Sequence, residues 1–235
     1  MTAPAPDELA ADISSVVDAH RTLAASLDSL DDATARRASR LPGWSVGHVL
    51  THLARNAESL VRVLDDAAHG RVGVQYPAGW ASRDADIEAG SGRSAAELRR
   101  DVAATSAALE VALAETSPAA WASGRAMRAD VEVPLSLLPL RRLQEVEIHR
   151  VDLGLGYEPA DWDDRFVERQ LGLLLPSLED RLPPEVAVEL AIDDRPPERF
   201  GSGPRPTSVR RSGRAVLHWL VGRSDDPMLP SLAGW

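Results

Sequence analysis

The sequence predicts a mainly helical α+β protein, with an N-terminal up-and-down four-helix bundle and a small C-terminal α+β domain. Apolar residues recur at helical spacing in four long segments of the first two thirds of the chain. Nearer the C-terminus, one segment instead alternates apolar and polar residues, as a half-buried strand does. Hydrophobic residues make up 44% and charged residues 26% of the 235 positions, a globular composition that argues against disorder.

The first two helices are placed by their apolar stripes and end signals. The first helix is expected over about residues 7–29. A turn over residues 41–45 then ends in Ser45, whose hydroxyl is a suitable N-cap for the second helix. Gly70 provides a C-terminal stop for that helix.

The third and fourth helices complete the predicted bundle. Residues 71–93 are rich in Gly, Ser and Pro and are expected to form a long loop. A capping box beginning at Ser94 starts the third helix. A short β segment is expected near residues 126–133, and the fourth helix carries its apolar stripe over 137–151 and ends at Gly154. Such bundles hold metal or ligand sites between facing helices.

A change in composition near residues 156–162 marks the expected boundary between two domains. We assign residues 1–157 to the bundle and residues 158–235 to the small α+β domain. The elements expected in the second domain are a helix over 163–178, strands over 185–192 and 206–211, and a helix over 214–221.

Composition excludes several kinds of chemistry and partner. The net charge is −10, so neither nucleic-acid binding nor attraction to an anionic membrane is expected. All 26 basic residues are arginines, which excludes Schiff-base lysine chemistry and a P-loop lysine. The chain has no cysteine, so any thiol used in a reaction must arrive on a ligand. With no signal peptide and no long apolar run, a soluble cytoplasmic protein is expected.

Two helical segments carry residues that commonly bind metal ions. His48 and His52 are four residues apart in the second helix, and Glu145 and His149 are four apart in the fourth. At 100° per residue, the members of each pair lie within about 40° of each other. His52, Glu145 and His149 together supply two nitrogens and one carboxylate, a usual ligand set for catalytic zinc. This spacing favours a metal site between the two helices.

Ordinary structural roles compete with this interpretation. A glutamate and a histidine four residues apart often form a surface ion pair. His52 alone suits a half-buried structural histidine, and His48 is close enough to the helix start to serve it as a cap. His20 lies on the apolar face of the first helix and is expected in the core, from which it could reach the bundle interior. His69 suits a helix C-terminus, and His218 a surface or domain contact.

Three segments resemble the signatures of the mycothiol-dependent maleylpyruvate isomerase family. These are LPGWSVGHVLTHLARNA at residues 41–57, EVEIHRVDLG at 145–154 and VGRS at 221–224. The resemblance extends over essentially the whole chain and implies a DinB-like four-helix bundle that holds a divalent metal, usually zinc. It also implies that the metal ligands are His52, Glu145 and His149.

The same resemblance implies mycothiol as the cosubstrate and a small electrophilic or dicarboxylate substrate. In the isomerase reaction of the family, a metal-bound thiolate adds to the cis double bond of maleylpyruvate, the intermediate rotates, and loss of the thiol gives fumarylpyruvate. Arg223 matches a family position associated with substrate or cosubstrate binding, and Arg83 is a weaker match. A guanidinium binds a carboxylate through two hydrogen bonds, although any one of 26 arginines could equally be a surface charge.

The resemblance leaves three functions open. The chain could be a maleylpyruvate isomerase, a mycothiol S-transferase that acts on other electrophiles, or a non-catalytic metal-binding bundle of the same fold. The identity of the acceptor, the native metal and the oligomeric state do not follow from the sequence.

Overall fold

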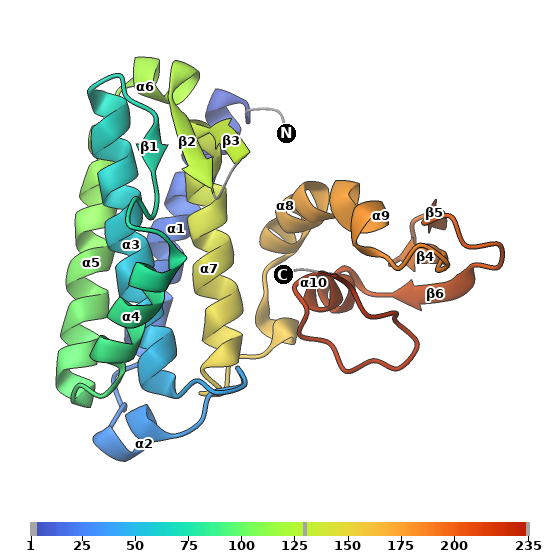
Figure 1. Cartoon of the computed structure of the whole chain (residues 1–235), viewed down its shortest axis with the longest axis horizontal. Helices are drawn as coiled ribbons and strands as arrows, with labels where there is room; N and C mark the ends of the chain where they lie inside the picture. The colour runs from blue at the N-terminus through green and yellow to red at the C-terminus, as the bar shows by residue number, and fades with distance from the viewer. Residues whose placement is uncertain (1–3, 129–130, 234–235) are drawn as a thin grey trace. The chain divides into compact units, whose positions relative to one another are not determined.

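The computed structural model describes residues 4–128 and 131–233, which form two compact units that divide between Tyr157 and Glu158. Four long helices build the first unit (Figure 1). They are α1 (Pro6–Ser26), α3 (Val46–Ala68), α5 (Ala95–Glu115) and α7 (Leu138–Asp152). Both α1 and α3 pack against α5 and α7, and leucine and valine side chains fill the space between them. The predicted four-helix bundle is confirmed.

The directions of the four helices follow from contacts at one end of the bundle. Asp32, just after α1, accepts a 2.7 Å hydrogen bond from the backbone N–H of Ala95 at the start of α5. Arg40, shortly before α3, donates from its backbone N–H to the carbonyl of Asp152 at the end of α7. Helices α1 and α7 therefore end where α3 and α5 begin. As a result α3 and α5 run parallel (Figure 1), which departs from the strict alternation of an up-and-down bundle.

The expectation of a long loop over residues 71–93 is wrong. This segment contains β1 (Gly73–Val74) and the twelve-residue helix α4 (Trp80–Ser91), which returns the chain to the start of α5. Ile87 is the only residue of α4 that is fully buried, so the helix has no apolar stripe for sequence periodicity to detect. Gly79 precedes it at φ 84°, a conformation that glycine adopts without strain.

Two short helices were also not predicted, α2 (Asp32–Arg36) and α6 (Pro118–Ser123). Each buries a single alanine, so neither shows an amphipathic pattern. The first bundle helix ends at Ser26, three residues before its expected end at residue 29.

A small sheet covers part of the bundle. The β segment expected near residues 126–133 is a hairpin of β2 (Arg125–Arg128) and β3 (Val131–Pro134), and β1 pairs with β2 in parallel. A 3-10 turn, η1 (Leu135–Leu137), then leads from β3 into α7. The sheet lies close to α3. At Gly73 of β1, an added Cβ would come within 2.8 Å of the Val63 backbone.

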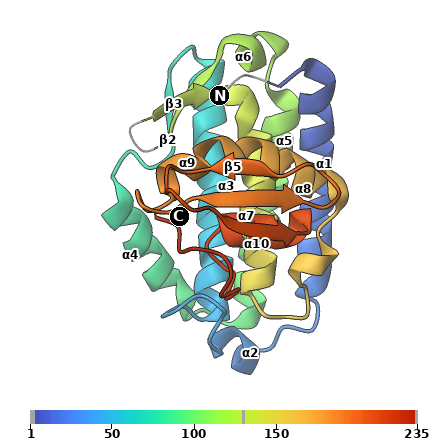
Figure 2. The same cartoon turned by 90° about the vertical axis from the view of Figure 1, so that its right-hand side faces the viewer.

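The second unit contains short helices and a three-stranded sheet. Its helical segments are η2 (Pro159–Asp161), α8 (Asp164–Leu174), η3 (Leu175–Ser177), α9 (Leu178–Arg181) and α10 (Gly213–Leu220). The expected helix over 163–178 ends early, since Pro176 lacks the N–H that an α-helix needs. The strands β4 (Val188–Ile192), β5 (Glu198–Phe200) and β6 (Thr207–Arg211) lie side by side in the order β5-β4-β6 (Figure 2).

The strand and helix predictions for this unit are close to the structure. Strand β4 lies within the alternating segment, and β6 pairs with it in parallel. Strand β5 was missed because it has three residues, two of them exposed. In the described part of the chain, no helix has the length and apolar character needed to cross a bilayer.

Candidate metal centre

Three side chains from two packed helices converge in the bundle. His52 lies in the second turn of α3, and Glu145 and His149 lie one turn apart on α7. One ligand atom from each falls within 4.8 Å of the others. Glu145 Oε2 is 2.8 Å from Nε2 of His52 and 3.5 Å from Nε2 of His149. The structure thus brings together His52, Glu145 and His149, the trio that the spacing had favoured.

The start of α3 fixes where His52 lies along the bundle. Ser45 caps the helix by accepting a hydrogen bond from the backbone N–H of His48, as the sequence predicts. His48 completes the cap, since its Nδ1 accepts from the backbone N–H of Ser45. His52 follows one turn later and is only 4% exposed. The edge of its ring meets the indole of Trp44, with 5.8 Å between ring centroids.

His149 is oriented by a buried carboxylate. Its Nδ1 donates a 2.8 Å hydrogen bond to Oδ2 of Asp152, one turn further along α7. Asp152 is 1% exposed. This hydrogen bond places the proton on Nδ1 and leaves the lone pair of Nε2 directed at the cluster, which is how metal-binding histidines are usually held.

Arg83 lies against the other side of His52. Its Nη2 donates a 3.0 Å hydrogen bond to Nδ1 of His52, and its Nη1 forms a 2.7 Å ion pair with Oδ1 of Asp84. It also stacks near the rings of Tyr76 and Trp80. The sequence had placed Arg83 in a loop, which is wrong, because the residue lies on the first turns of α4. The helix holds it in position beside the cluster.

The electrostatics of the trio are those of a carboxylate between two imidazoles. Burial lowers the pKa of His52 to about 4, although Glu145 acts in the opposite direction. Burial also disfavours the charged forms of Glu145 and His149, but side-chain hydrogen bonds to these charged forms outweigh the effect of burial. The two imidazoles hold the pKa of Glu145 well below its usual range. Asp152 and Glu145 raise the pKa of His149.

His20 belongs to a separate network in the bundle interior. Its Nε2 accepts a 3.0 Å hydrogen bond from Nε of Arg142, and its Nδ1 is 2.9 Å from a carboxylate oxygen of Glu110. Both nitrogens are therefore engaged outside the trio. Burial lowers the pKa of Arg142 to about 10, so its guanidinium stays charged at neutral pH.

Comparison with known proteins identifies the family. The family model described as the mycothiol maleylpyruvate isomerase N-terminal domain matches residues 16–154. This match covers more than half of the chain. The chain belongs to the mycothiol-dependent maleylpyruvate isomerase family.

Solved structures agree with this membership of the isomerase family. The crystal structure of the mycothiol-dependent maleylpyruvate isomerase is similar to the chain with a TM-score of 0.81 and 25% identity. The similarity covers 93% of this chain and 90% of that one. A structure of a histidine-to-alanine mutant of that isomerase matches equally well. No curated protein matched.

Two other residues singled out in the sequence lie outside the trio. His48 caps α3, and its Nε2 pairs with exposed Glu88 at 3.1 Å. Arg223 belongs to the second unit, where it follows α10. Gly222 at φ 68° ends that helix, and the Arg223 side chain donates a 3.0 Å hydrogen bond to the carbonyl of Val221.

Sequence reasoning missed two buried residues of α7 near the trio, Asp152 and Arg142. Asp152 follows His149 by three residues, so helical spacing could have indicated it as the partner of that imidazole. Arg142 precedes Glu145 by three residues, on the same face of α7. The sequence feature that could have indicated Arg142 is a charged residue on an otherwise apolar face of a helix.

Proposed function

We propose that this member of the family is a metal-dependent enzyme that uses mycothiol, with maleylpyruvate isomerisation as its reaction. Zinc is the proposed metal, held by His52, Glu145 and His149. The observation that carries the proposal is the convergence of these three residues within 4.8 Å, in a chain of this family. Two imidazole nitrogens and one carboxylate leave a coordination position for a substrate atom.

The donor atoms suit a divalent cation. Binding at His149 needs no change of tautomer, because the hydrogen bond to Asp152 already holds the ring proton on Nδ1. His52 requires a larger change. Because Arg83 donates to its Nδ1, the proton of His52 is on Nε2 and faces Glu145. Binding through Nε2 would move that proton to Nδ1, so it excludes the hydrogen bond from Arg83.

The nucleophile must come from outside the chain, which has no cysteine. A bound zinc ion would lower the pKa of a coordinated thiol and keep it as thiolate near neutral pH. His149 and Asp152 orient one ligand, while the carboxylate of Glu145 lies between the two imidazoles. The ring centroids of Trp44 and His149 lie 5.8 Å and 4.6 Å from that of His52, which is only 4% exposed, so little water reaches the imidazole.

The two domains have different proposed roles. The bundle, residues 1–157, holds the metal, and the domain formed by residues 158–235 supplies Arg223 as an anion contact. Arg83 is proposed as a second anion contact, because releasing His52 leaves its Nη2 available to a carboxylate while Nη1 stays paired with Asp84.

Transfer of mycothiol to another electrophile is the second candidate. In isomerisation the thiol sulfur adds to the double bond, the new single bond rotates, and the thiol leaves. In transfer the carbon–sulfur bond remains and the proton of the thiol ends on the acceptor. The same residues serve both reactions, so the acceptor decides between them.

Turnover measurements test the proposal. Metal-loaded protein is incubated with mycothiol and either maleylpyruvate or a panel of electrophiles, and the acceptor is followed over time. We expect thiol-dependent consumption that disappears when a chelator removes the metal. If no acceptor is consumed in a thiol-dependent reaction, the protein is a non-catalytic metal-binding bundle.

A further inference from the structure

The three proposed metal ligands lie across one of the less extensive interfaces of the bundle. Helix α3 packs closely along α5, and α1 packs closely along α7, whereas α3 and α7 contact each other less. His52 comes from α3, and Glu145 and His149 come from α7. The distances between these ligands therefore depend on how the α3–α5 pair of helices is held against the α1–α7 pair.

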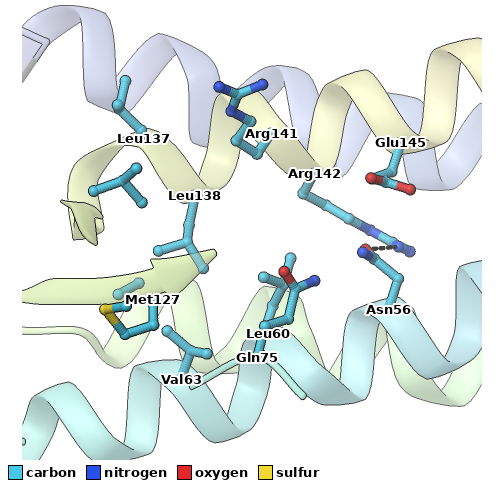
Figure 3. A pocket seen from close by; sticks show the side chains of 12 residues that line it. Asn56, Leu60, Val63, Gln75, Met127, Leu137, Leu138, Arg141, Arg142 and Glu145 are labelled. Carbon is cyan, nitrogen blue, oxygen red and sulfur yellow. Dashed lines mark hydrogen bonds between the residues drawn. The ribbon is translucent and has the colours of Figure 1, made fainter. Parts of the chain in front are cut away.

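Arg142 provides polar contacts that join these two pairs of helices. It lies on α7, three residues before Glu145, and is 1% exposed. Its Nη1 donates to the carbonyl oxygen of Leu53 at 2.9 Å and to Oδ1 of Asn56 at 2.8 Å, and both acceptors belong to α3. Figure 3 shows the Arg142 side chain extending from α7 to Asn56, with Glu145 on the same helix.

The contacts of Arg142 on α3 lie within about one turn of a proposed ligand. Leu53 directly follows His52, and Asn56 lies one turn beyond it. Within residues 4–128 and 131–233, the only other hydrogen bond between α3 and α7 is that of His52 with Glu145. Outside the trio, Arg142 is therefore the residue whose hydrogen bonds fix α3 against α7.

The network continues from Arg142 to the other two long helices. Nε of Arg142 donates a 3.0 Å hydrogen bond to Nε2 of His20 on α1, and Nδ1 of His20 lies 2.9 Å from Oε1 of Glu110 on α5. His20 is buried, whereas the side chain of Glu110 is 32% exposed. One chain of hydrogen bonds thus links all four helices, from the surface of α5 to the residue next to His52.

A guanidinium is well suited to holding helices in register. Its N–H groups lie in one plane and point in fixed directions, so several hydrogen bonds together fix its position. The acceptors on His20, Leu53 and Asn56 belong to residues that are at least 95% buried. A shift of α3 along α7 would break these bonds and leave buried polar groups without partners, which is unfavourable. The network therefore resists such a shift.

We propose that Arg142 is a positioning residue for the metal centre, and that His20 and Glu110 hold it in place. The network fixes α3 against α7 and thereby the separation of His52 from the two ligands on α7. The proposal rests on the proposed function, because it concerns the residues that would hold the metal. It adds that metal affinity depends on Glu110, which lies on a helix that carries none of the proposed ligands.

Cobalt titration of the parent protein and of Arg142 variants tests this role. Arg142→Gln should weaken Co²⁺ binding by about 10- to 100-fold, the usual effect of losing a residue that orients metal ligands. Arg142→Lys keeps the charge but not the planar group, so it should recover only part of the loss. Equal Co²⁺ affinity in the parent and in folded Arg142→Gln would overturn the proposal.

Glu110 tests the network without a change at α3 or α7. Glu110→Leu removes the acceptor of His20 and should weaken Co²⁺ binding by about 3- to 10-fold. Glu110→Gln keeps an acceptor oxygen and should stay near the parent. In the Arg142→Gln background, Glu110→Leu should have no further effect, because it acts through Arg142. Unchanged affinity in Glu110→Leu, or equal losses in the two Glu110 variants, would contradict the network, and this comparison decides if Arg142→Gln does not fold.

Asp101→Asn separates positioning from a general loss of stability. Asp101 on α5 accepts hydrogen bonds from Arg55 of α3 at 2.7 Å and from Arg93 at 2.6 Å, so it joins α3 to α5 and not to α7. This variant should lower the free energy of unfolding and leave Co²⁺ affinity unchanged. A loss of affinity as large as that of Arg142→Gln would show that any destabilised bundle binds the metal poorly, which would overturn the proposal.

Imidazole ¹⁵N NMR of the protein without metal distinguishes the positioning role from the proposed function. Nε2 of His52 lies 2.8 Å from Oε2 of Glu145, so its signal reports on the approach of α3 to α7. Arg142→Gln should shift this signal, and Asp101→Asn should not. A shift in a protein that binds no Co²⁺ would support positioning and contradict the proposed function. A parent that binds Co²⁺, with signal and affinity unchanged in Arg142→Gln, would have the opposite meaning.

Discussion

The buried histidines differ in protonation because their neighbours differ. Burial, and then the positive charge of Arg142, lowers the pKa of His20 to about 3. His20 is therefore neutral in the fold, which lets Nε2 accept from Arg142 while Nδ1 donates to Glu110. The carboxylate of Glu110 and the guanidinium of Arg142 are linked through this neutral ring.

The low pKa of His20 makes the stability of the protein depend on pH. The unfolded chain binds a proton at this residue near pH 6.5, whereas the folded chain does so only near pH 3. The contribution of His20 to the free energy of unfolding is fully present above about pH 6.5. Below that pH it falls by up to about 1.4 kcal/mol per pH unit. Urea unfolding, followed by far-UV circular dichroism, should show a steeper loss between about pH 7 and 5 in the parent protein than in His20→Gln.

The comparison with His20→Gln isolates this group. His52, whose pKa is lowered to about 4, adds a loss of the same sign in both proteins. His149 and Glu110 have raised pKa values and act in the opposite direction. Equal pH dependence in the parent and the variant would contradict the assigned role of His20.

The residues of the candidate site differed in how far the sequence could predict them. His52, Glu145 and His149 were predictable because helical spacing puts Glu145 and His149 on one face of a helix and ligand chemistry selects the third. The hydrogen bonds of Arg142 were not, since they join α7 to α1 and α3 and depend on how the helices pack.

The long helices of the bundle are encoded by strong local patterns, whereas α4 is not. Helix α3 buries most of its length, and its cap at Ser45 was predictable. Helix α4 buries Ile87 alone and is held by tertiary contacts, including the pairing of Arg83 with His52. The small sheet likewise depends on contacts between distant segments. Local patterns do not reveal such contacts.

The close approach of α3 and α4 gives a prediction about Gly47. A Cβ at this position would lie 2.2 Å from the carbonyl oxygen of Ser91 and 3.3 Å from that of Ala35. Alanine favours a helix over glycine by about 1 kcal/mol, but the backbone of α4 must move to admit it. We expect Gly47→Ala to destabilise the protein by about 1–3 kcal/mol in urea unfolding.

Gly92 provides a matched control at the end of α4. A Cβ there meets nothing within 4 Å, and its φ of −85° suits any residue. Gly92→Ala should leave the free energy of unfolding within about 0.5 kcal/mol of the parent. Equal stability of the two variants would show that α3 and α4 are not in close contact at Gly47.

The chain divides into two compact units, and Arg223 and the proposed metal ligands lie in different ones. If Arg223 in the second unit contacts an anionic substrate, Arg223→Ala should retain the metal and the fold. Loss of one charged hydrogen bond costs about 1.5–3 kcal/mol, which is about a 10- to 100-fold decrease in kcat/KM. Steady-state kinetics and elemental analysis measure the two effects, and an unchanged kcat/KM would make Arg223 a surface residue.

Cobalt substitution tests whether the metal centre coordinates a thiol. Protein loaded with Co²⁺ should develop a thiolate-to-metal charge-transfer band when mycothiol is added near neutral pH, because a metal-bound thiol ionises below its usual pKa of about 8.5. The band should saturate with mycothiol. His52→Ala and His149→Ala should lose the metal, whereas His69→Ala, at the exposed end of α3, should retain both metal and band. A spectrum of cobalt-loaded protein that does not respond to mycothiol would contradict coordination of the thiol at the metal.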